Sequence, residues 1–255
     1  MSGLRPVAAL LCAALLACTA TPPAAPDTRR TGFDDMSPAL QAMQRDETRN
    51  PGMLWVQEGQ ALWSQRAANG KSCTGCHAAG LQGVAASYPA FDTTLGKPRT
   101  LASRIDQCRA QHLGETSQGA DGAQVLPLSA WLAHQSRGAR VAPRRDASMT
   151  PWTDRGAQLW QQRLGQLNLS CAQCHDQRAG ARLGGAAIPQ AHPTGYPTYR
   201  LEWQGLGSLE KRLRSCVVGV RAEPFAAGAD EWLALEVYLM QRAAGMEHEG
   251  VAVRP

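Results

Sequence analysis

Long apolar segments are almost absent from this chain of 255 residues. The longest runs from Val7 to Ala17 and follows Arg5, the only charge near the N-terminus. It is too short to span a bilayer as a mature helix, so it predicts a secretory signal peptide over residues 1–25. A lipoprotein signal with lipid on Cys18 is the alternative. The signal peptide leads us to expect an exported, periplasmic protein. Because no later segment is apolar enough to cross a membrane, we expect no membrane span.

Lysine is also scarce, since only Lys71, Lys97 and Lys211 accompany the arginines among the 26 basic residues. Arginine binds oxyanions through a fixed fork of donors, which makes small anions plausible partners. No basic run carries interleaved aromatic residues, so we expect no nucleic-acid binding. Alternating β-branched runs are too few for a sheet, which predicts an all-α fold.

Cysteine is the informative residue type, with eight copies, of which Cys12 and Cys18 fall in the predicted signal peptide. Four others form two CxxCH motifs, Cys73-Thr74-Gly75-Cys76-His77 and Cys171-Ala172-Gln173-Cys174-His175. This pattern places two thiols one helical turn apart for addition to haem vinyl groups, and the adjacent histidine ligates the iron. A four-cysteine zinc site would leave both histidines unexplained. We therefore predict two covalently bound haem c groups, attached through Cys73, Cys76, Cys171 and Cys174, with His77 and His175 as axial ligands.

The sequence repeats itself around these motifs. Gly59 and Trp63 precede the first motif, and Gly156 and Trp160 precede the second, each pair on one helix face. Each unit ends in a predicted amphipathic helix, over residues 126–137 and 230–244. We thus predict two tandem c-type cytochrome domains related by internal repeat. Their bounds are 51–138 and 153–250, joined by an exposed linker over 139–152 and preceded by a flexible N-terminal extension over 26–50.

A second pair of matching segments ends in the two remaining cysteines. Leu101–Cys108 and Leu209–Cys216 both read L-x-x-R-[I/L]-x-x-C and follow plausible N-caps, Thr100 and Ser208. The leucine, the aliphatic residue and the cysteine of each segment fall on one helical stripe. Both cysteines should therefore face the core of their domain, which in a haem domain contains the macrocycle.

The ligand opposite each histidine bears on function, because simple electron carriers use methionine there. No methionine lies between Met53 and Met149, so the first domain has none downstream of its motif. The candidates are Cys108, His112 and His134 in the first domain, and Cys216, His192, Met240 and Met246 in the second. Only a cysteine occurs at equivalent places in both repeats, which favours thiolate ligation by Cys108 and Cys216. A Cys108–Cys216 disulfide is the alternative in an exported protein.

The stretch Arg212–Pro224, with Arg-x-x-x-Cys followed by Arg-Ala-Glu-Pro, resembles the active-site segment of a known family. From about Met53 to Gly245 the chain is similar to the dihaem A subunits of the Sox cytochrome complex of bacterial sulfur oxidation, L-cysteine S-thiosulfotransferase. The resemblance implies two haems ligated by histidine and cysteine, and a catalytic Cys216 that carries a persulfide. It also implies a small monohaem cytochrome subunit as partner and a sulfur-carrier protein as substrate.

The reaction that this resemblance implies joins thiosulfate oxidatively to a cysteine of the carrier and passes two electrons to a c-type cytochrome. Thiosulfate is a dianion, and Arg212, one turn before Cys216, can reach its neighbourhood. Arg221, five residues after Cys216, is a second candidate. Because Arg104 occupies the place of Arg212 in the first repeat, pairing with a haem propionate is an alternative role. For the whole protein, the alternatives are a dihaem electron-transfer protein without bond-making catalysis and a dihaem peroxidase.

Overall fold

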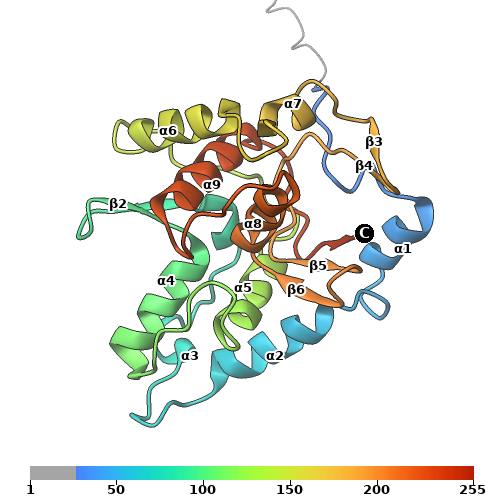
Figure 1. The fold of residues 1–255 in the computed structure, drawn as a ribbon. Coiled ribbons are helices and arrows are strands. Elements are labelled where there is room, and N and C mark those ends of the chain that lie inside the picture. The colour runs from blue at the N-terminus through green and yellow to red at the C-terminus, as the bar shows by residue number, and fades with distance from the viewer. Residues whose placement is uncertain (1–26) are drawn as a thin grey trace, which may run out of the picture.

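The computed structural model of the protein describes residues 27–255. The predicted signal peptide and Cys18 lie outside these residues. Helices make up most of the regular structure (Figure 1). They are α1 (Pro38–Arg45), α2 (Met53–Ser64), α3 (Cys73–Cys76), α4 (Leu101–Cys108), α5 (Val125–His134), α6 (Thr150–Gln161), α7 (Cys171–His175), α8 (Leu209–Gly219) and α9 (Asp230–Arg242), with a 3₁₀ helix at Val84–Ser87 and a π-helical turn at Arg109–Leu113.

Short strands also occur, so the all-α prediction is too narrow. They are β1 (Ala90–Asp92), β2 (Lys97–Arg99), β3 (Arg182–Leu183), β4 (Ala186–Ala187), β5 (Thr198–Arg200), β6 (Gly205–Gly207) and β7 (Val253–Arg254). β1–β2 and β3–β4 form hairpins, and β5 lies between β6 and a parallel β7. Each strand has two or three residues, which is too few for an alternating pattern to appear in the sequence.

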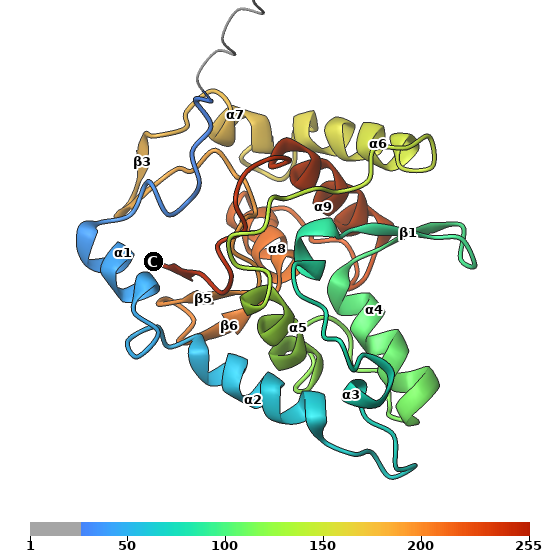
Figure 2. The same ribbon diagram turned by 180° about the vertical axis from the view of Figure 1, so that it is seen from behind.

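Two crossed helix pairs, α2 with α5 and α6 with α9, form equivalent parts of the two repeats (Figures 1 and 2). At each crossing a glycine faces the partner backbone. A Cβ on Gly59 would lie 2.0 Å from the Pro127 carbonyl oxygen, and one on Gly156 would lie 2.1 Å from the Ala234 carbonyl oxygen. The repeated glycines are therefore required by close helix packing.

A hairpin followed by a helix forms the next repeated unit. β1–β2 leads into α4, and β5–β6 leads into α8. Thr100 and Ser208 are the N-caps of these helices, as predicted, and each side-chain oxygen accepts a hydrogen bond from a backbone N–H at 3.1 Å. Both hairpins begin after a cis Tyr–Pro bond, at Tyr88–Pro89 and Tyr196–Pro197.

The two repeats share one of their cores. Val56 and Ala130 of the first repeat pack with Tyr199 and Leu206 of the second and with Val253 near the C-terminus. No helix within residues 27–255 has both the length and the apolarity to cross a membrane.

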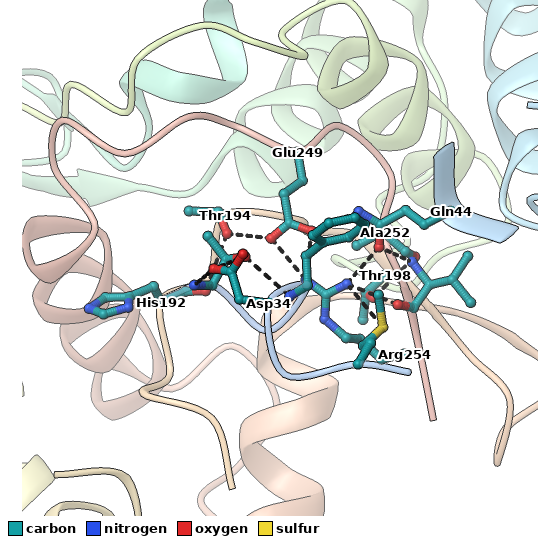
Figure 3. Close-up of polar contacts among 12 residues, drawn as sticks. Asp34, Gln44, His192, Thr194, Thr198, Glu249, Ala252 and Arg254 are labelled. Carbon is teal, nitrogen blue, oxygen red and sulfur yellow. Dashed lines mark hydrogen bonds and ion pairs between the residues drawn. The ribbon is translucent and has the colours of Figure 1, made fainter. Parts of the chain in front are cut away.

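The segment over 26–50, predicted as a flexible extension, contains α1 and is tied to the C-terminal strand β7. The Gln44 side-chain oxygen accepts from the Val253 backbone N–H at 3.0 Å and from the Arg254 guanidinium at 2.6 Å. Arg254 also donates to the buried carboxylate of Glu249, at 2.7 and 2.8 Å (Figure 3). The residues that hold this segment in place lie more than 200 positions away in the sequence, so no local pattern could predict these contacts.

The linker over 139–152 is only partly exposed, contrary to the prediction. Val141 is 1% exposed and packs with Met240 and Met246, and Met149 is also 1% exposed. The Val141 backbone N–H donates to the Met246 carbonyl oxygen at 2.9 Å. The segment thus holds the end of α9 instead of spanning open solvent.

Candidate functional site

The residues of the first CxxCH motif line an apolar cavity. Ser72 caps the short helix α3 by accepting from the Gly75 N–H at 3.3 Å. Cys73, Cys76 and His77 line the cavity, and Cys108 from α4 also lines it. The remaining lining residues are mostly apolar and include Trp63, Leu81, Val84, Leu101, Ile105, Leu128 and Leu132. The structure therefore brings all four predicted haem-1 residues to one cavity.

A buried arginine at this cavity has one terminal nitrogen without a hydrogen-bond partner among residues 27–255. Arg109 is 4% exposed, and its Nη1 has no hydrogen-bond partner among residues 27–255. Its other terminal nitrogen bonds Gln124 and lies 3.5 Å from Glu115. Apolar walls, two thiols, a histidine and a guanidinium nitrogen that is free to donate are groups that suit a covalently attached haem with carboxylate side chains. The residues present fit that group.

The second motif holds its histidine more firmly. The His175 Nδ1 lies 2.7 Å from the Pro189 carbonyl oxygen. Because a carbonyl only accepts, Nδ1 carries the proton and Nε2 is left for a metal. Burial lowers the pKa of His175, which favours the neutral ring. The Trp160 ring lies 5.6 Å from the His175 ring, in the same relation as Trp63 to His77 at 5.7 Å.

The sequence did not predict the ion pair of Asp176 with Arg242, next to His175. Asp176 accepts from Trp160 Nε1 at 2.7 Å and from Arg242 at 2.7 Å. The Arg242 guanidinium also lies over the Trp160 ring, 4.8 Å from its centre. The first repeat has Ala78 in place of Asp176, so comparison of the repeats offered no signal for this pair.

In each repeat the third cysteine lies beside the first cysteine of the motif. Burial raises the pKa of the Cys171 thiol to about 11, and the neighbouring Cys216 contributes. Burial likewise raises the pKa of Cys73, with Cys108 as the next contributor. All six cysteines within residues 27–255 are free. The alternative of a Cys108–Cys216 disulfide is therefore wrong, because each sulfur belongs to a separate site.

The other candidate iron ligands lie in different surroundings. Met240 and Met246 pack in a separate cluster with Val141, away from the cluster that contains Cys171. His192 bonds the Arg30 carbonyl oxygen through Nδ1 at 2.7 Å. His112 lines the first cavity but is exposed, whereas His134 packs on Trp131 outside it.

The two equivalent arginines differ in their partners. Arg104 lies 2.9 Å from the buried carboxylate of Asp92, whereas Arg212 lies 3.9 Å from the half-exposed carboxylate of Glu202. Arg221 follows the end of α8 with a left-handed backbone, φ 58°, and its side chain is exposed. Of the two predicted arginines, Arg212 lies on the same helix as Cys216, and Arg221 lies beyond its end.

Comparisons with known proteins agree with this arrangement. A family model described as "SoxA/TsdA, cytochrome c domain" matches residues 58–141 and 155–248. The L-cysteine S-thiosulfotransferase subunit SoxA of Rhodovulum sulfidophilum is 34% identical over 89% of this chain and 81% of that protein. Its counterpart from Pseudaminobacter salicylatoxidans is 36% identical over 82% of this chain and 75% of that protein.

The crystal structure of SoxXA from P. pantotrophus matches with a TM-score of 0.85 and 31% identity, covering 89% of this chain and 87% of that one. Two cytochrome c domain matches, each containing a CxxCH motif, mean that this chain carries two covalently bound haem c groups. The chain belongs to the SoxA/TsdA family of c-type cytochromes.

Proposed function

We propose that this chain is the catalytic subunit of an L-cysteine S-thiosulfotransferase, which conjugates thiosulfate oxidatively to a cysteine of a sulfur-carrier protein in the periplasm. The observation that carries the proposal is the free thiol of Cys216, beside Cys171 of the second CxxCH motif and one helical turn after Arg212. A simple electron carrier has no use for a thiol and a cation at this position. The names of the SoxA relatives carry the same activity.

The chemistry balances as two steps on sulfur. The Cys216 thiolate forms a bond to the outer sulfur of thiosulfate, giving an enzyme S-thiosulfonate and releasing two electrons to a c-type cytochrome. The carrier thiol loses its proton to solvent and attacks that same outer sulfur, and the Cys216 thiolate leaves. If Cys216 carries an added sulfur, as the family resemblance implies, its terminal sulfur takes this part.

The haem-binding roles follow the repeat. Cys73, Cys76, Cys171 and Cys174 would hold the haems through thioether bonds, and His77, Cys108, His175 and Cys216 would ligate their irons. The shared lining of the first cavity and the Cys171–Cys216 proximity support this set. A bound haem with thiolate ligation supplies an iron of low reduction potential that exchanges single electrons.

The partners in this proposal are a small monohaem cytochrome subunit and a sulfur-carrier protein. The similarity to a chain solved within SoxXA supports the first of these partners. The carrier follows from the reaction, because the thiosulfate group needs a cysteine to accept it.

Replacement of Cys216 tests the proposal. Cys216→Ser, with both haems still attached, should lose carrier conjugation by about three orders of magnitude, since the nucleophile is gone. Cys108→Ser is the matched control in the first repeat and should keep most of the activity. Mass spectrometry of the carrier, incubated with thiosulfate and oxidised cytochrome, measures the product. Full conjugation by Cys216→Ser would leave only electron transfer as the role of this chain.

A further inference from the structure

The segments around the two spare cysteines align without a gap. Tyr88 to Cys108 and Tyr196 to Cys216 have the same length, and both contain a cis Tyr–Pro bond, a hairpin and a capped helix. Every residue of the first segment therefore has one counterpart in the second. Arg212 is the counterpart of Arg104, and the hairpins contribute the remaining charges near them.

In the first repeat a buried carboxylate neutralises the arginines. Asp92, whose side chain is 6% exposed, lies 2.7 Å from Arg99 and 2.9 Å from Arg104. Its carboxylate also accepts from the backbone N–H groups of Thr94 and Leu95. An anion from solvent cannot displace a carboxylate that is held from four sides without leaving those donors unpaired.

In the second repeat the residue at the position of Asp92 has the opposite charge. Arg200 stands where Asp92 does, and Gly207 stands where Arg99 does. The nearest carboxylate is now Glu202, which lies 2.7 Å from Arg200 and 3.9 Å from Arg212 and is 50% exposed. Two guanidinium groups thus flank one carboxylate that approaches them from the solvent side.

We propose that Arg200 and Arg212 together bind the sulfonate end of thiosulfate, and that Glu202 occupies this position as a counter-ion until the dianion displaces it. This inference rests on the proposed function and adds Arg200 and Glu202 to the substrate site. The Glu202 side chain is half exposed, so water can solvate its carboxylate when the dianion displaces it, and the displacement costs little. Three sulfonate oxygens and a double charge satisfy two guanidinium groups better than one carboxylate does.

Arg212 and Cys216 lie one helical turn apart on α8, which connects this site with the reacting sulfur. In the first repeat Tyr88, Arg104 and Cys108 line one cavity, so their counterparts Tyr196, Arg212 and Cys216 are expected around the second site. Burial raises the pKa of Tyr196, while the charges of Arg212 and Arg200 oppose that rise and the thiol of Cys216 adds to it.

Direct binding measurements on the full-length protein with both haems attached test the inference. Thiosulfate is titrated calorimetrically into the oxidised protein without carrier. Arg200→Gln should raise the Kd about tenfold, and Glu202→Gln should lower it about threefold because the competing carboxylate is gone. Arg155→Gln removes a charge from an exposed pair with Glu231 and should leave the Kd unchanged.

The opposite signs separate binding from folding, because damage to the hairpin would weaken binding in both hairpin variants. An unchanged or higher Kd for Glu202→Gln overturns the inference. So does an unchanged Kd for Arg200→Gln with a shifted reduction potential, which would assign Arg200 to a haem propionate. If the wild type conjugates the carrier while these affinities stay equal, only the inference fails. If the affinities change as stated and no carrier is conjugated, only the proposed function fails.

Discussion

Asp176 shows how single residues make the two haem sites unequal. It joins Trp160 and Arg242 directly behind His175, each at 2.7 Å, whereas Ala78 follows His77 in the first repeat. Together with the bond from His175 to Pro189, this pair fixes the ring of the second histidine. A fixed imidazole keeps its metal-binding nitrogen aimed at one point, which is what a reacting centre needs.

Replacement of Asp176 by alanine should lower the free energy of unfolding by about 2 kcal/mol, because two hydrogen bonds, one of them to a charged group, are lost. Denaturant unfolding of the protein with both haems attached measures this loss. Glu247→Ala is the control, since Glu247 pairs with Arg140 at 3.3 Å on the exposed surface and should cost well under about 1 kcal/mol. Equal effects of the two variants would contradict the structural role of Asp176.

Helix pairs are the elements on which both haem motifs depend. α2 leads into the first motif and α6 into the second, and each crosses the last helix of its repeat at a glycine. Trp63 and Trp160 lie one turn after these glycines and contact the motif histidines. The crossing distance therefore sets where each histidine stands.

At this scale, Gly156→Ala should destabilise the protein by about 2–3 kcal/mol, because the new methyl group would lie 2.1 Å from the Ala234 carbonyl oxygen and force the helices apart. Gly219→Ala provides the matched control. Gly219 ends α8 with no atom near its Cβ position, so alanine there should stabilise by about 0.5 kcal/mol. Thermal unfolding followed at the haem absorption band distinguishes the two, and a tolerated Gly156→Ala would disprove the close crossing.

The whole molecule is one assembly of two repeats, with ionisable groups buried where they meet. A cavity between the repeats is lined by Glu236, Glu210 and His248, together with Tyr88 and Tyr196 from the two hairpins. Burial raises the pKa of Glu236 to about 8, and Glu210 adds to the effect. Burial lowers the pKa of His248 to about 4.

These two pKa values predict how stability depends on pH. Between about pH 6.5 and 8 the folded protein keeps a proton on Glu236 that the unfolded chain releases, so the free energy of unfolding falls as pH rises. The slope is about 1.4 kcal/mol per pH unit. Folded His248 titrates near pH 4 and the unfolded residue near pH 6.5, at the lower edge of this range, so its contribution is the same in wild type and variant. Glu236→Gln should therefore flatten the decline, measured as unfolding midpoints at pH 6.5 and pH 8. Parallel pH profiles for variant and wild type would contradict it.

The contacts of Arg254 with Gln44 and Glu249 give a second prediction for the whole molecule. Burial raises the pKa of Glu249, but the charge and hydrogen bonds of Arg254, with hydrogen bonds from Thr194 and Gln44, outweigh it and hold that pKa below its usual range. Arg254→Ala leaves this carboxylate buried without its cation and should cost about 3 kcal/mol at neutral pH. Because a lowered pKa stabilises above the ordinary value and is lost in acid, the variant should differ least from the wild type near pH 3. A difference that is constant from pH 7 to 3 would contradict the pairing.

Local sequence was enough to predict the haem motifs, the repeat, both helix caps and the cysteines on α4 and α8. Those features depend on residues within a few turns of one another, and helical periodicity or a fixed ligand spacing records them directly. Tyr88–Pro89 and Tyr196–Pro197 are related by the same offset as the two cysteines, so the sequence contains this equivalence too. The hairpins themselves are too short for their strands to leave a pattern.

Only the tertiary structure decided which charge each arginine faces. The sequence places Arg104 and Arg212 at identical positions, yet a buried Asp92 holds one and an exposed Glu202 approaches the other. Nor could it predict that Gln44 and Arg254 meet, since 210 residues separate them. Ion pairs and buried hydrogen bonds depend on distance in space and on burial, and neither is written in the spacing of residues along the chain.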